Sequence, residues 1–236
     1  MKRFLLILLL IQGITIFAST KNLLKEATTL YNTGKFTESA EKFEKVLENI
    51  KNPDIYYNLG NAYYKSGKLG LAILNYKRSL KMRWDEDCQK NLTLALSQTK
   101  DNISENINIF ENWILKQNSD NWFKAFLIIL SIFSLLISRM IWRRRFRIIT
   151  ISSFLFLLIM TGSIFGLSVS MHSRQEGVVI SSETGVQSAP IAGETVSFKL
   201  HEGAIVEIVK EQGRWLRIML PNGLSGWILK KDIGLI

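Results

Sequence analysis

The sequence predicts a multidomain chain that joins an all-α domain of helical repeats, a hairpin of two transmembrane helices and a small all-β barrel. Residues 23–80 carry small and aromatic side chains at the spacing of paired, packed helices. Two apolar runs, 122–141 and 148–169, each approach the ~20 residues that a helix needs to cross a bilayer. From Gly177 onward, short runs that alternate between apolar and polar residues are typical of β-strands.

The N-terminal segment predicts export from the cytoplasm. Residues 1–18 begin with Lys2 and Arg3, continue as an apolar run and end at the small residue Ala18, which is the pattern of a secretory signal peptide. We expect cleavage after Ala18, and an uncleaved anchor is the alternative. In both cases the residues that follow are predicted to leave the cytoplasm.

The positive charge of the chain is concentrated beside its apolar runs. The net charge is +10, and half of it comes from five arginines: Arg139, Arg143, Arg144, Arg145 and Arg147. A nucleic-acid-binding protein would spread its basic residues along a docking face, so we expect no nucleic acid as a partner. Arginine-rich loops between spanning helices stay in the cytoplasm. The sequence therefore predicts transmembrane helices at 122–142 and 148–170, a cytoplasmic loop at 143–147, and both flanking parts on the outer side.

Small residues in the second span predict a close helix contact. Gly162 and Gly166 are four positions apart, which allows the backbone of another helix to approach. The first span, through Ser131 and Ser134, is the nearest candidate for that contact.

The repeat pattern is clearest in residues 56–80, YYNLGNAYYKSGKLGLAILNYKRSL. Gly60 and Ala72 are small where two helices would cross, and Gly67 would end the first of them. This stretch resembles a tetratricopeptide repeat (TPR), a pair of antiparallel helices that stacks on its neighbours. A weaker copy departs from the pattern at Glu26 and Ser39. We expect a TPR domain at 19–98, with repeats at about 20–52 and 53–85, a closing helix at 86–98 and a polar connector at 99–121.

The concave face of such an array predicts a groove for an extended peptide. Asparagine amides can bind a peptide backbone, and tyrosine rings can pack against its side chains. The candidate groove residues are Tyr31, Asn32, Tyr57, Asn58, Asn61, Tyr64, Lys65 and Asn91. The alternative for the asparagines is that they belong to the generic repeat and hold no ligand.

The C-terminal segment, 171–236, predicts five short strands that curl into a small barrel. The strand candidates are VVIS, VSFKL, AIVEIV, RWLRIML and GWIL, and Pro221-Asn222-Gly223 predicts a tight turn between the last two. The pattern resembles an SH3-like (SH3b) domain. We expect Trp215, Trp227 and Phe198 to lie in its core.

No residue pattern points to an active site. His201-Glu202 begins like the helix of a zinc protease, but Ile205 stands where the second histidine is required. Cys88 is the single cysteine, so it has no partner for an internal disulfide. We expect no catalytic residue, no metal and no cofactor, and predict that the chain is not an enzyme.

The order of these segments resembles the bacterial aerotolerance (Bat) proteins of the BatE type. The resemblance rests on residues 57–63, YNLGNAY, and on a tail that contains Ser188-Ala189-Pro190, Leu200-His201-Glu202-Gly203, Trp215, Pro221-Asn222-Gly223 and Gly226-Trp227-Ile228. It implies a multi-pass protein of the bacterial cytoplasmic (inner) membrane, with the TPR and SH3-like domains in the periplasm. It also implies partners that contain von Willebrand A domains, a MoxR-type ATPase, and a role in aerotolerance or stress. It supplies no reaction.

The sequence as a whole favours a membrane-anchored scaffold for protein–protein interaction. Its expected partners are other membrane proteins and the lipid bilayer. One alternative is a protein that binds the cell wall (peptidoglycan) through the SH3-like domain. Another is a redox sensor that uses Cys88.

Overall fold

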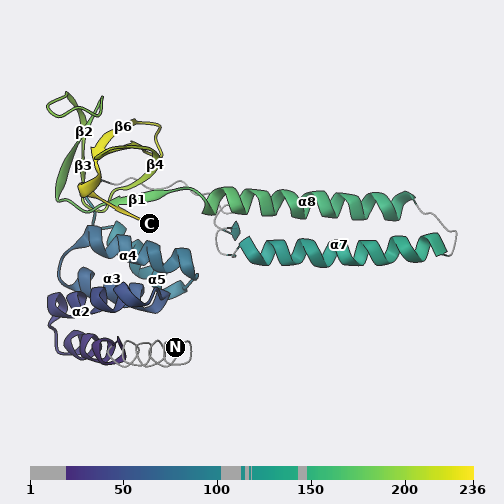
Figure 1. The fold of residues 1–236 in the computed structure, drawn as a ribbon, viewed down its shortest axis with the longest axis horizontal. Helices are drawn as coiled ribbons and strands as arrows, with labels where there is room; N and C mark the ends of the chain where they lie inside the picture. Colours follow the sequence, from purple (N-terminus) through teal and green to yellow (C-terminus); the bar gives the residue numbers. More distant parts are fainter. Residues whose placement is uncertain (1–19, 102–112, 115–116, 118, 143–147) are drawn as a thin grey trace, which may run out of the picture. The chain divides into compact units, whose positions relative to one another are not determined.

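The computed structural model describes residues 20–101, 113–114, 117, 119–142 and 148–236. The predicted signal peptide and the predicted arginine loop lie outside these residues. The chain forms two compact units: one combines the segment up to Ser104 with Gln175–Ile236, and the other is Glu105–Arg174. The first contains helical repeats and an antiparallel sheet, and the second contains two long apolar helices, so the predicted fold class is confirmed (Figure 1).

The helical part of the first unit is built from antiparallel helix pairs. Its elements are a helix at 20–32, α2 (Phe36–Asn49), α3 (Pro53–Lys65), α4 (Leu69–Met82) and α5 (Glu86–Leu96).

Local sequence explains where α3 begins and ends. The Asn52 side chain accepts hydrogen bonds from the backbone N–H groups of Asp54 (2.8 Å) and Ile55 (3.4 Å), and Pro53 occupies the first turn, where no N–H is needed. After α3 the chain reverses at Gly67, whose φ of +79° is a conformation that glycine adopts without strain. The Lys68 N–H then bonds the Tyr63 carbonyl at 2.9 Å, which closes the helix end.

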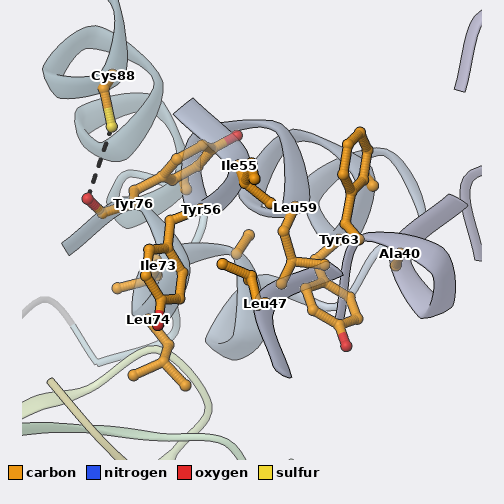
Figure 2. Packing of buried hydrophobic residues seen from close by; sticks show 14 of the residues in the cluster. Ala40, Leu47, Ile55, Tyr56, Leu59, Tyr63, Ile73, Leu74, Tyr76 and Cys88 are labelled. Carbon is orange, nitrogen blue, oxygen red and sulfur yellow. Dashed lines mark hydrogen bonds between the residues drawn. The ribbon is translucent and has the colours of Figure 1, made fainter. Parts of the chain in front are cut away.

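Small residues and aromatic rings form the core of the repeats. Figure 2 shows Tyr56, Leu59, Ile73 and Tyr76 packed between α3 and α4. A Cβ placed on Gly60 would lie 2.6 Å from the Tyr76 ring and 3.3 Å from the Ala72 carbonyl oxygen. The glycine is therefore what lets these helices approach so closely.

The two departures in the first repeat are accommodated. Ser39 is fully buried, but its hydroxyl donates a 2.8 Å hydrogen bond to the Ala27 carbonyl oxygen. Its burial therefore leaves no unsatisfied hydrogen-bond donor. Glu26 lies at the surface and pairs with Lys42 at 2.7 Å. Neither residue disturbs the packing of α2.

The described residues after Gln175 form a seven-stranded antiparallel sheet in the order β3-β2-β6-β5-β4-β1-β7. Its strands are β1 (Glu176–Val179), β2 (Glu183–Gln187), β3 (Val196–His201), β4 (Ile205–Gln212), β5 (Trp215–Met219), β6 (Ser225–Leu229) and β7 (Ile233–Leu235).

The interior of the sheet is apolar and its predicted turn is present. Val186, Leu216, Ile218 and Ile228 are all fully buried in one cluster. The Gly223 N–H bonds the Leu220 carbonyl at 2.9 Å, which closes the turn between β5 and β6. Trp215 is buried as predicted. Phe198 is half-buried and packs against this cluster. Trp227 is half-buried and does not belong to the cluster, so its assignment to the core is wrong.

The sheet and the repeats share part of one hydrophobic core. Val178 of β1 and Ile205 of β4 belong to the same buried cluster as Ile73 and Leu74 of α4. Figure 2 shows Leu74 pointing from its helix toward the strands. A Cβ on Gly234 of β7 would collide with the Leu74 side chain, so strand and helix touch directly.

Polar contacts surround this apolar contact. Lys77 pairs with Glu176 at 2.7 Å, and the Arg78 guanidinium donates to the Leu235 carbonyl oxygen through Nε (3.0 Å) and Nη2 (2.7 Å). Burial lowers the pKa of Arg78 from its ordinary value. The Leu235 carbonyl oxygen thus accepts two hydrogen bonds from a half-buried cation.

The string His201-Glu202-Gly203 forms a second contact with the repeats. The His201 ring Nδ1 lies 2.9 Å from Asp101 Oδ1, and the His201 N–H donates to Asp101 Oδ2 at 2.6 Å. Glu202 accepts a 3.2 Å hydrogen bond from the Gly70 N–H in the first turn of α4, where a negative charge is favoured. The described residues contain no group of three or more potential metal ligands, and here the histidine joins two parts of the fold.

The second unit contains α7 (Ser119–Trp142) and α8 (Ile148–His172). Both are long and apolar enough to cross a membrane, over Asp120–Met140 and Ile151–Met171. They run side by side (Figure 1), with Phe123 against Phe165 and Phe133 against Phe154.

The predicted serine contacts of the second span are not found. A Cβ on Gly162 would lie 3.7 Å from the Phe126 ring of α7, and a Cβ on Gly166 would meet nothing within 4 Å. Phenylalanine rings therefore contribute to the contact between α7 and α8, as one stacked pair (Phe133–Phe154) and one tilted pair (Phe123–Phe165).

Candidate functional site

A cavity of about 280 Å³ lies between the helices of the repeat domain. It is lined by Tyr31, Tyr57, Asn61, Tyr64, Lys65, Tyr76, Asn91 and Leu94. These side chains come from the 20–32 helix, α3, α4 and α5. Each helix contributes to one shared space, because residues three or four positions apart lie on the same helix face.

Six of the eight predicted groove residues line this cavity. Asn32 is exposed and Asn58 is half-buried, and neither is among the lining residues. Tyr76 and Leu94 were not predicted. Tyr76 is 1% exposed, so its ring is core and only its hydroxyl group reaches the cavity network. Leu94 is three positions after Asn91, a spacing that could have indicated it.

A hydrogen-bond network fixes the floor of the cavity. Asn61 Oδ1 accepts from the Tyr76 hydroxyl (2.8 Å) and from Asn91 Nδ2 (2.9 Å). Asn91 Nδ2 also donates to the Tyr57 hydroxyl oxygen at 3.1 Å. The network joins α3, α4 and α5, so the site is organised before any ligand arrives.

The phenols of Tyr31 and Tyr76 stay protonated at neutral pH. Burial, and then the neighbouring phenol of Tyr57, raise the pKa of both Tyr31 and Tyr76 above the ordinary value. Each hydroxyl therefore remains able to donate a hydrogen bond. Lys65, which is exposed at the rim, supplies the positive charge of the site.

Cys88 lies in the core of the repeats. It is fully buried, and its sulfur is 3.6 Å from the Tyr76 carbonyl oxygen (Figure 2). Burial raises the pKa of the Cys88 thiol to about 11. Because the thiolate is the reactive form and needs access to its oxidant, these surroundings oppose a redox-sensing role.

The outer surface of the sheet carries an aromatic residue beside a cation. In the strand register, Trp227 of β6 lies between Arg217 of β5 and Gln187 of β2. Trp227 is half-buried and Arg217 is exposed. This surface therefore offers a flat ring and a positive charge next to each other.

Paired helices around a lined cavity, together with a small antiparallel sheet, define a chain built from interaction modules. Comparison with known families agrees with this class: residues 53–83 match the model described as tetratricopeptide repeat, 28–67 match TPR repeat, and 182–233 match bacterial SH3 domain. No curated protein matches the chain. Modules of both kinds are typically non-catalytic, and they indicate protein or peptidoglycan partners.

Proposed function

We propose that the chain is a membrane-anchored scaffold whose repeat domain holds a segment of a partner protein. The observation that supports this best is the cavity, which four helices line and whose polar floor is already hydrogen-bonded. A site that is organised in advance loses less entropy on binding. The tyrosine rings offer the apolar contact and the polar tip that make tyrosine common in interfaces.

Site-specific photocrosslinking tests this function in intact cells. A photoreactive amino acid at Leu94, which is 50% exposed at the cavity, is expected to give a light-dependent adduct with the partner. The matched control is Met82, which is 45% exposed and is not among the cavity residues. Adducts of equal yield from both positions, or from neither, would contradict the cavity as the binding site.

We also propose that both outer parts of the chain share one compartment, on the periplasmic side. Segments before and after the second unit pack into a single unit, which supports an even number of membrane crossings between them. The two candidate spans supply that number. Arg139, in the last turn of α7, begins the arginine cluster that favours the cytoplasm for the connecting loop.

The resemblance to the BatE-type proteins suggests the setting of this scaffold. We propose that it acts in a bacterial inner-membrane complex linked to aerotolerance, with von Willebrand A-domain proteins and a MoxR-type ATPase as its partners. The support for this is the order of segments and the tail string around His201, which in this structure joins the sheet to the repeats.

A second candidate function is binding of cell-wall peptidoglycan by the sheet. It is favoured by Trp227 and Arg217, since an indole ring can pack on the apolar face of a sugar and a guanidinium can pair with a carboxylate.

The full chain in detergent is expected to sediment with isolated peptidoglycan. Trp227→Ala should reduce the bound fraction about fivefold or more, on the scale of ~1 kcal/mol for one aromatic contact. Leu224→Ala, which removes an exposed apolar residue of the β5–β6 turn, is the control. Equal losses in both variants would argue against the Trp227 surface.

A further inference from the structure

We infer that the cavity of the repeat domain recognises the carboxylate of an acidic side chain in the partner segment. This rests on the proposed function of the cavity as a peptide groove. It adds the chemistry of the occupant, and it is supported by the hydrogen-bonding groups that the network leaves unused.

The network uses Asn61 Oδ1 as its shared acceptor and leaves several donors unused. Asn61 Oδ1 already accepts two hydrogen bonds, from Tyr76 and Asn91, so Asn61 has only its amide hydrogens left to offer. The Tyr57 hydroxyl oxygen accepts from Asn91, which leaves its own hydrogen free to donate. The Tyr64 hydroxyl is in the same position, because Gln98 Nε2 donates to it at 2.6 Å.

The charge around these donors is positive. Lys65 lines the cavity, is exposed, and makes no ion pair with any residue that the structure describes. Of the described residues that line the cavity, none is acidic. Several donors and one ammonium group facing a common space match a carboxylate, since charge-assisted hydrogen bonds are about twice as strong as neutral ones.

The size of the cavity fits one side chain of an extended segment. Its volume of about 280 Å³ exceeds that of a carboxylate group, so the methylene groups of a glutamate can pack against the tyrosine rings. Asn91 Oδ1 is the acceptor that the network leaves over, and it suits a backbone N–H of the same segment.

Binding of two synthetic peptide pools to the full chain in lipid nanodiscs tests this inference. The pools contain random twelve-residue peptides with both ends blocked and with glutamate fixed at the centre of one pool and glutamine at the centre of the other. We expect the glutamate pool to bind about tenfold more tightly, the scale of one hydrogen bond to a charged group. Lys65→Gln and Tyr57→Phe should reduce this preference to near unity. Lys45→Gln removes the same charge from an exposed position outside the cavity and should leave the preference unchanged.

The outcomes separate this inference from the proposed function. Equal binding of the two pools would support the cavity as a peptide groove and contradict its preference for a carboxylate. No binding of either pool would overturn both. If Lys45→Gln also lost the preference for glutamate, the preference would come from the net charge of the domain and not from the cavity. Binding only after the C-terminal block is removed would assign the site to a terminal carboxylate and overturn the side-chain assignment.

Discussion

Gly203→Ala is expected to loosen the contact between the sheet and the repeats by about 2–5 kcal/mol. Its φ of +89° is a left-handed conformation that costs alanine about 1–2 kcal/mol. The added Cβ would also lie 2.8 Å from Ile73 Cδ1 and would collide with the Thr99 methyl group. Overpacking of this kind costs about 1–3 kcal/mol. Amide hydrogen exchange of the detergent-solubilised chain should accelerate in α4 and β1, because residues of these two elements share the core between the repeats and the sheet.

Gly213→Ala is the matched control for this prediction. Gly213 also has a positive φ, of +58°, but a Cβ there would meet nothing within 4 Å. The Gly213→Ala variant should therefore show only the destabilisation that comes from backbone strain. The difference in exchange protection between the two variants measures the contact with Ile73 and Thr99. Equal loss of protection in α4 from both variants would show that this contact contributes nothing.

Labelling of single cysteines is expected to give an all-or-none result for the arrangement of the chain across the membrane. In a Cys88→Ala background, Lys45→Cys of α2 and Lys210→Cys of β4 place thiols at exposed positions in the repeats and the sheet. Both should react with a membrane-impermeant maleimide in spheroplasts. Arg143→Cys, in the predicted cytoplasmic loop, should react only after the membrane is opened.

The informative comparison is between the two outer positions. Because sheet and repeats share a core, labelling of one with protection of the other would contradict their packing in a single compartment. Labelling of all three positions in intact spheroplasts would contradict the cytoplasmic assignment of the loop.

Sequence patterns predicted the fold class because each pattern is local. The repeat depends on Gly60 and Ala72, which are small where α3 and α4 cross, and the spans depend on uninterrupted apolar runs. Two strands were missed for a similar reason. β2 (Glu183–Gln187) is polar with a central glycine, and β7 (Ile233–Leu235) is only three residues long, so neither has the alternation that marks a strand.

The candidate site was predictable in part. Tyr57, Asn61 and Tyr64 repeat at helical spacing on α3, so a shared face could be inferred. The parts of Gln98 and Tyr76 could not be inferred, since Gln98 follows α5 and donates to the Tyr64 hydroxyl group from there, and Tyr76 occupies a core position. The contact between sheet and repeats has no sequence signal: Arg78 and Leu235 are 157 positions apart, and nothing in either stretch points to the other.

The discontinuous first unit sets an order of events during synthesis. Ile73 and Leu74 are made early, but the strands that bury them come from the last part of the chain. About 130 residues separate Ser104 from Ile236, and at roughly 5–20 residues per second their translation takes roughly 7–26 s. For that interval the apolar face that α4 presents to the sheet stays uncovered. A chain that stops after α8 would keep this face exposed, so we expect it to aggregate more readily than the full chain.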